Sequence, residues 1–200
     1  MRLILSLCLL ATATSAQMFI EPWRVISSLT YDWDSDGLQD RAVLAEVENP
    51  DSFATLDLFI YREDPDQFGF IEAQRIRDIA WQGRMWGTHA TMVLNDAGSI
   101  QIVSGNEAIG RGRWNEILTI AYRDEAYRLA GFYYYWRDTL ELDDNGSCDV
   151  NMLNGKAEVR VGEGELLKVS HTIPPLPLEL WSLMEVREFC GKVRSDALAE

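Results

Sequence analysis

Apolar and polar residues alternate in short runs along most of the chain, which predicts a succession of β-strands rather than helices. In the run 53–61, Leu56, Leu58 and Ile60 fall on one side of an extended chain and Asp57 falls on the other. Turn-forming residues separate the runs and predict antiparallel hairpins. The further strands expected on this pattern are 42–47, 91–94, 100–103, 114–122, 127–136, 157–161 and 166–173.

The run 127–136 is aromatic on both sides of the expected strand, and such a strand is typical of a sheet centre covered on both faces. After three prolines between 174 and 177, the pattern changes to near-helical spacing over about 178–190. Gly191 is expected to end this helix. The apolar residues that define its expected buried face are Leu180, Trp181, Met184 and Phe189.

The fold class predicted is therefore mainly β. Antiparallel hairpins are expected to form a single blade-like or sandwich-like domain over 17–200, with one C-terminal amphipathic helix lying on the sheet. Residues 1–16 have the pattern of a secretory signal peptide: Arg2, a short apolar run, and small residues up to Ala16. The apolar run is too short to span a bilayer, so we expect a secreted, periplasmic or extracellular protein without a membrane span.

The formal charge of −14 disfavours binding to nucleic acid or to anionic lipid. Two cysteines, Cys148 and Cys190, follow the signal segment, and an even pair in an oxidising compartment predicts a disulfide. Their separation lacks the close spacing of a zinc site. The disulfide is expected to fix the C-terminal helix to the strand that carries Cys148.

Four aspartates lie in the segment 32–40, which reads DWDSDGLQD. Oxygen ligands at alternate loop positions, with a glycine at the sixth position for a sharp turn, suit Ca²⁺. An EF-hand loop would need Glu at position 12, where this chain has Val43, and the residues that follow the loop predict a strand instead of a helix. The alternative to an ion site is a solvated acidic turn.

The pattern D-x-D-x-D-G-x-x-D between two strands resembles the loop of FG-GAP (VCBS, integrin α-type) repeats. The resemblance covers about residues 25–62. It implies that calcium is held by Asp32, Asp34, Asp36, Asp40 and the carbonyl group of Leu38. A complete propeller of such repeats needs several hundred residues, so the chain is too short to form one.

A second acidic turn has the same spacing as the first one. Its residues, offset by a constant 109 positions, are Glu141, Asp143, Asn145, Gly146 and Asp149. Glu is a poor first ligand because of its longer side chain, and Asp-Asn-Gly is a common hairpin turn. We therefore expect one tight calcium site, with the second turn as a possible weaker one.

No catalytic constellation stands out in the sequence, and the two histidines lack neighbours at metal-ligand spacing. The function that the sequence favours is a secreted, calcium-stabilised β-domain that binds an unknown protein or polysaccharide. The alternatives are a secreted, carboxylate-based glycosidase-like hydrolase and a purely structural envelope protein. The tryptophans and tyrosines could line a binding face, although burial in the core is the more usual use of aromatic residues in sheets.

Overall fold

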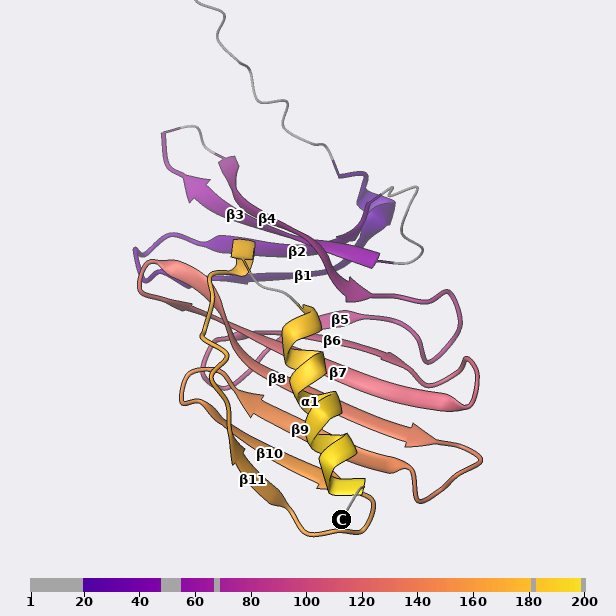
Figure 1. Cartoon of the computed structure of the whole chain (residues 1–200). Coiled ribbons are helices and arrows are strands. Elements are labelled where there is room, and N and C mark those ends of the chain that lie inside the picture. The colour runs from indigo at the N-terminus through magenta and orange to yellow at the C-terminus, as the bar shows by residue number, and fades with distance from the viewer. Residues whose placement is uncertain (1–19, 48–54, 67–68, 181–182, 199–200) are drawn as a thin grey trace, which may run out of the picture.

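The computed structural model describes residues 20–47, 55–66, 69–180 and 183–198 (Figure 1). They form two antiparallel sheets and one C-terminal α-helix, so the expectation of a mainly β fold is confirmed. The predicted signal peptide lies outside the described residues. Among the described helices, none is long and apolar enough to cross a membrane.

The N-terminal sheet has four strands that follow one another in chain order, after a single 3₁₀ turn, η1 (Pro22–Arg24). Its strands are β1 (Val25–Tyr31), β2 (Asp40–Glu46), β3 (Thr55–Asp64) and β4 (Gly69–Trp81). The predicted pattern of β3 is confirmed, since Leu56, Leu58 and Ile60 are fully buried.

The larger sheet has seven strands, each paired with its neighbours in the sequence. They are β5 (Thr91–Leu94), β6 (Ile100–Asn106), β7 (Gly112–Arg123), β8 (Ala126–Asp138), β9 (Asn145–Asn151), β10 (Lys156–Val161) and β11 (Leu167–Ser170). The aromatic strand β8 is the fourth of the seven, as its composition predicted.

The two sheets share one hydrophobic core. Leu44 and Leu58 of the small sheet belong to the same cluster as Ile102 and Leu118 of the large one. The sheets also meet at their edges, where Met92 N of β5 donates a 3.1 Å hydrogen bond to Ser27 Oγ of β1. One edge of each sheet is therefore covered by the other, which removes two exposed strand edges.

Strand β4 has no counterpart in the sequence prediction, because charged residues interrupt its alternation. A bulge accommodates them, with Asp78 at a positive φ of 51°. Asp57 of β3 is buried beneath this bulge, where its carboxylate accepts bonds from Arg75 Nε at 2.8 Å and Asp78 N at 3.0 Å. The polar side of β3 is thus not a solvated face: it carries a buried ion pair.

The C-terminal helix differs from the expected one at both ends. A 3₁₀ turn, η2 (Leu178–Leu180), precedes it, and α1 runs over Leu183–Leu198. Gly191 lies inside the helix, at a cost of about 1 kcal/mol relative to alanine. An ion pair of Lys192 with Asp196, one turn apart, supports the segment beyond the glycine.

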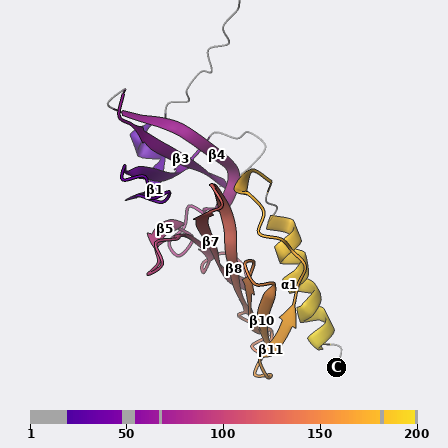
Figure 2. The same cartoon turned by 90° about the vertical axis from the view of Figure 1, so that its left-hand side faces the viewer.

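The buried face of α1 is also different from the expected one. Leu180 is 68% exposed, and Trp181 and the side chain of Met184 lie outside the described residues. Val186 and Cys190, which are four residues apart, are the buried residues of the helix, and Phe189 packs at their side. Figure 2 shows α1 on one side of the seven-stranded sheet.

Cys148 of β9 and Cys190 of α1 form a disulfide, as the sequence predicted. The bond joins residues 42 positions apart, and closure of such a loop stabilises the fold by about 4 kcal/mol on the chain-entropy model. A disulfide indicates an oxidising compartment.

Candidate metal centre

The loop between β1 and β2 brings three carboxylates together. Oxygen atoms of Asp32, Asp34 and Asp36 lie within 4.8 Å of one another. This is the one group of three or more potential metal-ligating side chains found among the described residues. Asp36 is exposed, whereas Asp32 and Asp34 are half-buried. Solvent can therefore reach the cluster from the side of Asp36.

Backbone geometry explains why the loop can turn so tightly. Ser35 and Gly37 both have positive φ values, of 61° and 89°. This conformation points backbone N–H groups inward, so that Gly37 N donates to Asp32 Oδ2 at 3.0 Å and Leu38 N donates to Asp36 Oδ1 at 2.8 Å. These bonds fix the orientation of two of the three carboxylates.

Asp40 has a different role from the other three aspartates. It is 3% exposed, begins β2, and accepts hydrogen bonds at Oδ2 from Trp33 N and from the hydroxyl of Tyr127 on β8, at 3.3 and 3.4 Å. Burial raises the pKa of Asp40, and the negative charge of Asp34 raises it further. Asp40 thus links the loop to the large sheet.

Arg62 of β3 contacts the loop. It forms an ion pair with Asp34 at 3.5 Å and donates a 3.1 Å hydrogen bond to the hydroxyl of Tyr122 on β7. One guanidinium does not neutralise three clustered carboxylates. The remaining charge, and a donor set made only of oxygen atoms, fit a hard divalent cation.

Trp33 connects the loop to the opposite sheet. It is 8% exposed, and its Nε1 donates a 2.9 Å hydrogen bond to the carbonyl oxygen of Gly98, in the β5–β6 turn. The rings of Tyr31 and Tyr127 pack against it, at centroid distances of 5.8 and 6.2 Å. The acidic loop therefore lies at the junction of the two sheets. This position could not be predicted from the sequence, because the contacts join residues far apart in the chain.

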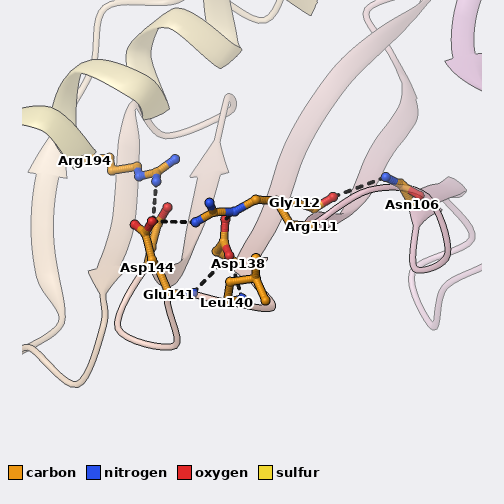
Figure 3. A network of polar contacts seen from close by, with 8 residues as sticks. All are labelled: Asn106, Arg111, Gly112, Asp138, Leu140, Glu141, Asp144 and Arg194. Carbon is orange, nitrogen blue, oxygen red and sulfur yellow. Dashed lines mark hydrogen bonds and ion pairs between the residues drawn. The ribbon is translucent and has the colours of Figure 1, made fainter.

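The second acidic turn is organised differently (Figure 3). Glu141 is paired with Arg111 at 2.6 Å, and the same guanidinium is bound to Asp138 at 2.6 Å. Asp143 is exposed in the turn. Asp144, which was not among the predicted ligands, is paired with Arg194 of α1. These ion pairs connect the turn to Arg111, which directly precedes β7, and to Arg194 of α1.

The last three residues of the second motif, Asn145, Gly146 and Asp149, lie in strand β9. Asn145 begins β9 and its side chain donates to the carbonyl oxygen of Leu142, whereas Asp149 lies within β9 opposite Tyr133 and Glu158. Among the described residues, the carboxylates of this motif do not form a cluster like that of the first loop. The spacing of the first motif is therefore repeated in the sequence, but its cluster of carboxylates is not repeated among the described residues.

The aromatic residues divide between core and surface. Trp136 is 5% exposed and belongs to the core, whereas Trp86 is 89% exposed. Trp86 lies in a turn held by Thr88, whose Oγ1 donates to the carbonyl oxygen of Met85, and by a 2.9 Å bond from Glu107 N to the carbonyl oxygen of Gly87. The exposure of Trp86 is thus a property of an ordered turn.

Comparisons of the chain with models of protein families, with curated proteins and with solved structures found no match.

Proposed function

We propose that the cluster of Asp32, Asp34 and Asp36 binds Ca²⁺ and that the ion has a structural role at the junction of the two sheets. The observation that carries the proposal is the convergence of three carboxylates within 4.8 Å on one hydrogen-bonded loop. The resemblance of the loop to FG-GAP repeats supports calcium as the ion, as does the preference of Ca²⁺ for oxygen ligands in flexible geometry.

The ion would act on stability because the loop is tied to both sheets through Trp33, Asp40 and Arg62. Without a cation, the carboxylates repel one another at the point where the sheets pack. A ligand that binds only the folded state stabilises it by about 2.7 kcal/mol at a free concentration one hundred times its Kd. Calcium should therefore strengthen the contact between the sheets.

Thermal unfolding with calcium and with a chelator tests this proposal. We expect a higher Tm with calcium, and Asp36→Asn should abolish the difference, because it removes one ligand charge without touching Arg62 or Tyr127. Asp96→Asn, in the exposed β5–β6 turn, is the matched control and should keep the full calcium effect. Equal Tm values for the unsubstituted protein in both conditions would contradict a structural calcium site.

We further propose that the protein works as a binding module for a protein or polysaccharide partner. The supporting observation is Trp86, which is 89% exposed on an ordered turn beside the 53% exposed Met85. A large exposed aromatic ring with a polar N–H is a common anchor in binding surfaces. Because its turn is already held by hydrogen bonds, little conformational entropy would be lost on binding.

A panel of insoluble polysaccharides and soluble glycans tests the polysaccharide partner. Retention of the protein that is lost in Trp86→Ser but kept in Val93→Ser, a change at another exposed apolar residue, would support binding through the turn. Absence of retention on every polysaccharide would exclude that class and leave a protein partner. Equal retention of both variants would move the binding site away from Trp86.

A further inference from the structure

A cavity of about 160 Å³ lies between strand β8 and helix α1. It is lined by two aromatic residues of β8 and by four residues on one face of α1. These residues are Tyr134, Trp136, Arg187, Cys190, Gly191 and Arg194. A cavity of this size can hold a benzene-sized group. The carboxylates of the acidic loop contribute nothing to its lining.

The polar groups that line the cavity are hydrogen-bond donors. Trp136 is 5% exposed and its Nε1 is buried, so this residue offers its ring to the cavity and not its N–H. Tyr134 adds a hydroxyl whose pKa is raised by burial.

Two arginines supply the positive charge at the cavity. Arg187 donates from Nε to Oε2 of the buried Glu116 at 3.0 Å, and Arg194 pairs with Asp144. A guanidinium has five N–H donors, and these contacts occupy only some of them. Neither Glu116 nor Asp144 lines the cavity itself, so the lining presents donors without a carboxylate acceptor.

Gly191 explains why the cavity is open. A Cβ atom added at this position would meet nothing within 4 Å, so close packing does not require a glycine. Glycine inside a helix is also disfavoured relative to alanine. Its presence here leaves free the space that a side chain from the middle of α1 could fill.

We infer that this cavity binds a small carboxylate with an apolar body about the size of a benzene ring. The carboxylate would accept hydrogen bonds from Arg194 and Arg187, and the body would pack on the rings of Tyr134 and Trp136. Charge-assisted bonds from guanidinium groups to a carboxylate are among the stronger hydrogen bonds in proteins. The ligand thus supplies the acceptors that the lining lacks.

Benzoate is the probe. Acetate, which has the carboxylate without the ring, and benzyl alcohol, which has the ring without the charge, are the comparison compounds. Titration of the disulfide-bonded protein, followed by tryptophan fluorescence and NMR, should give saturable benzoate binding with a Kd on the order of 1 mM or tighter. Both comparison compounds should bind at least about tenfold more weakly. Lack of saturation by benzoate well above this concentration, or equal binding of benzyl alcohol, would overturn the inference.

Two substitutions locate the binding. Gly191→Leu should fill the cavity and abolish benzoate binding without lowering Tm, whereas Glu188→Leu, which adds the same side chain at an exposed position of α1, should leave binding unchanged. Arg194→Gln should weaken binding at least about tenfold, since it removes the charge but keeps a donor. Benzoate affinity unchanged in both Gly191→Leu and Arg194→Gln would place the ligand elsewhere and refute the site.

Discussion

The indole N–H of Trp33 donates a 2.9 Å hydrogen bond to the carbonyl oxygen of Gly98, so a residue of the acidic loop closes onto a turn of the other sheet. Sixty-five positions separate the two residues in the chain. The loop therefore connects the two sheets, in addition to bringing the carboxylates together. Stability and cation binding should consequently respond to the same substitutions.

The substitution Trp33→Phe tests the contribution of this hydrogen bond. The substitution keeps an aromatic ring next to Tyr31 and Tyr127 but removes the bond to Gly98, and we expect a loss of about 1 kcal/mol in the free energy of unfolding. Calcium affinity should fall as well, because the loop loses one of its attachments. Urea unfolding and calorimetric titration measure the two effects; a variant as stable as the unsubstituted protein would show that the bond is unimportant.

Calcium stoichiometry distinguishes the two acidic turns. We expect one tight ion per chain, because Glu141 of the second turn is paired with Arg111 and Asp149 lies in a strand away from it. Asp143→Asn should leave the stoichiometry at one, and Asp34→Asn should remove the tight site. Two ions in the unsubstituted protein and one in Asp143→Asn would show that the second turn is a metal site after all.

Loss of the disulfide should destabilise the fold without changing its strand order. Replacement of Cys148 and Cys190 by serine removes a cross-link between residues 42 positions apart, and we expect the free energy of unfolding to fall by about 4 kcal/mol. Intact-mass measurement after alkylation without reductant should detect no free thiol in the oxidised protein. Alkylation of both cysteines under these conditions would disprove the bond.

Arg187→Leu should destabilise the protein in a pH-dependent way. Glu116 is 1% exposed; burial raises its pKa, and the charge of Arg187 acts in the opposite direction. Without Arg187 the folded-state pKa rises further, so an unpaired buried carboxylate must either ionise or take up a proton near pH 7. At pH 7 we expect the free energy of unfolding to fall by roughly 2 kcal/mol. This loss is smaller than that expected for a fully buried ion pair, because Arg187 is partly solvated.

The sign of the pH effect follows from the raised pKa. Below the ordinary value of 4.5 the carboxyl is protonated in both folded and unfolded chains, so the difference between Arg187→Leu and the unsubstituted protein should shrink. As pH rises through the folded-state pKa, the difference should grow. Urea unfolding at about pH 4 and pH 7 measures it, with Arg123→Leu at an exposed strand end as the control. A loss that is equal at both pH values would contradict this explanation.

We predict no hydrolase activity on common glycan, ester or peptide substrates. The cavity between β8 and α1 is lined by arginines and aromatic rings, without the pair of carboxylates that a glycosidase requires. Assays of the purified protein check this expectation. Turnover that is lost on substitution of a single carboxylate would contradict it.

Local patterns in the sequence predicted much of the fold. Alternation identified strands such as β3 and β7, the turn that ends at Gly98 identified a hairpin, and the cysteine pair identified the disulfide. Strand β4 was not predicted, because a bulge and a buried ion pair take the place of apolar alternation in it. Gly191 was expected to end the helix, but packing and the disulfide sustain α1 beyond a residue of low helix propensity.

The candidate site was predictable only in part. The spacing of Asp32, Asp34 and Asp36 indicated a cluster, and the structure brings these three together. The attachment of Asp40 to Tyr127 and of Asp34 to Arg62 depends on how the two sheets pack. Such contacts between distant segments leave no periodic signal in a single sequence, and neither does a cavity opened by the absence of one side chain.

The strand order of both sheets has a consequence for how the chain folds. Each strand pairs with the strand next to it in sequence, so every ladder can form by closing a short loop. Sheets built from such local pairings have a low contact order for a β protein and are expected to form quickly. The contacts between distant segments hold one sheet against the other, and they are made by Ser27, Trp33 and Arg62. Docking of the preformed sheets, rather than strand pairing, should therefore limit the folding rate, and a cation that joins the acidic loop before docking should accelerate it.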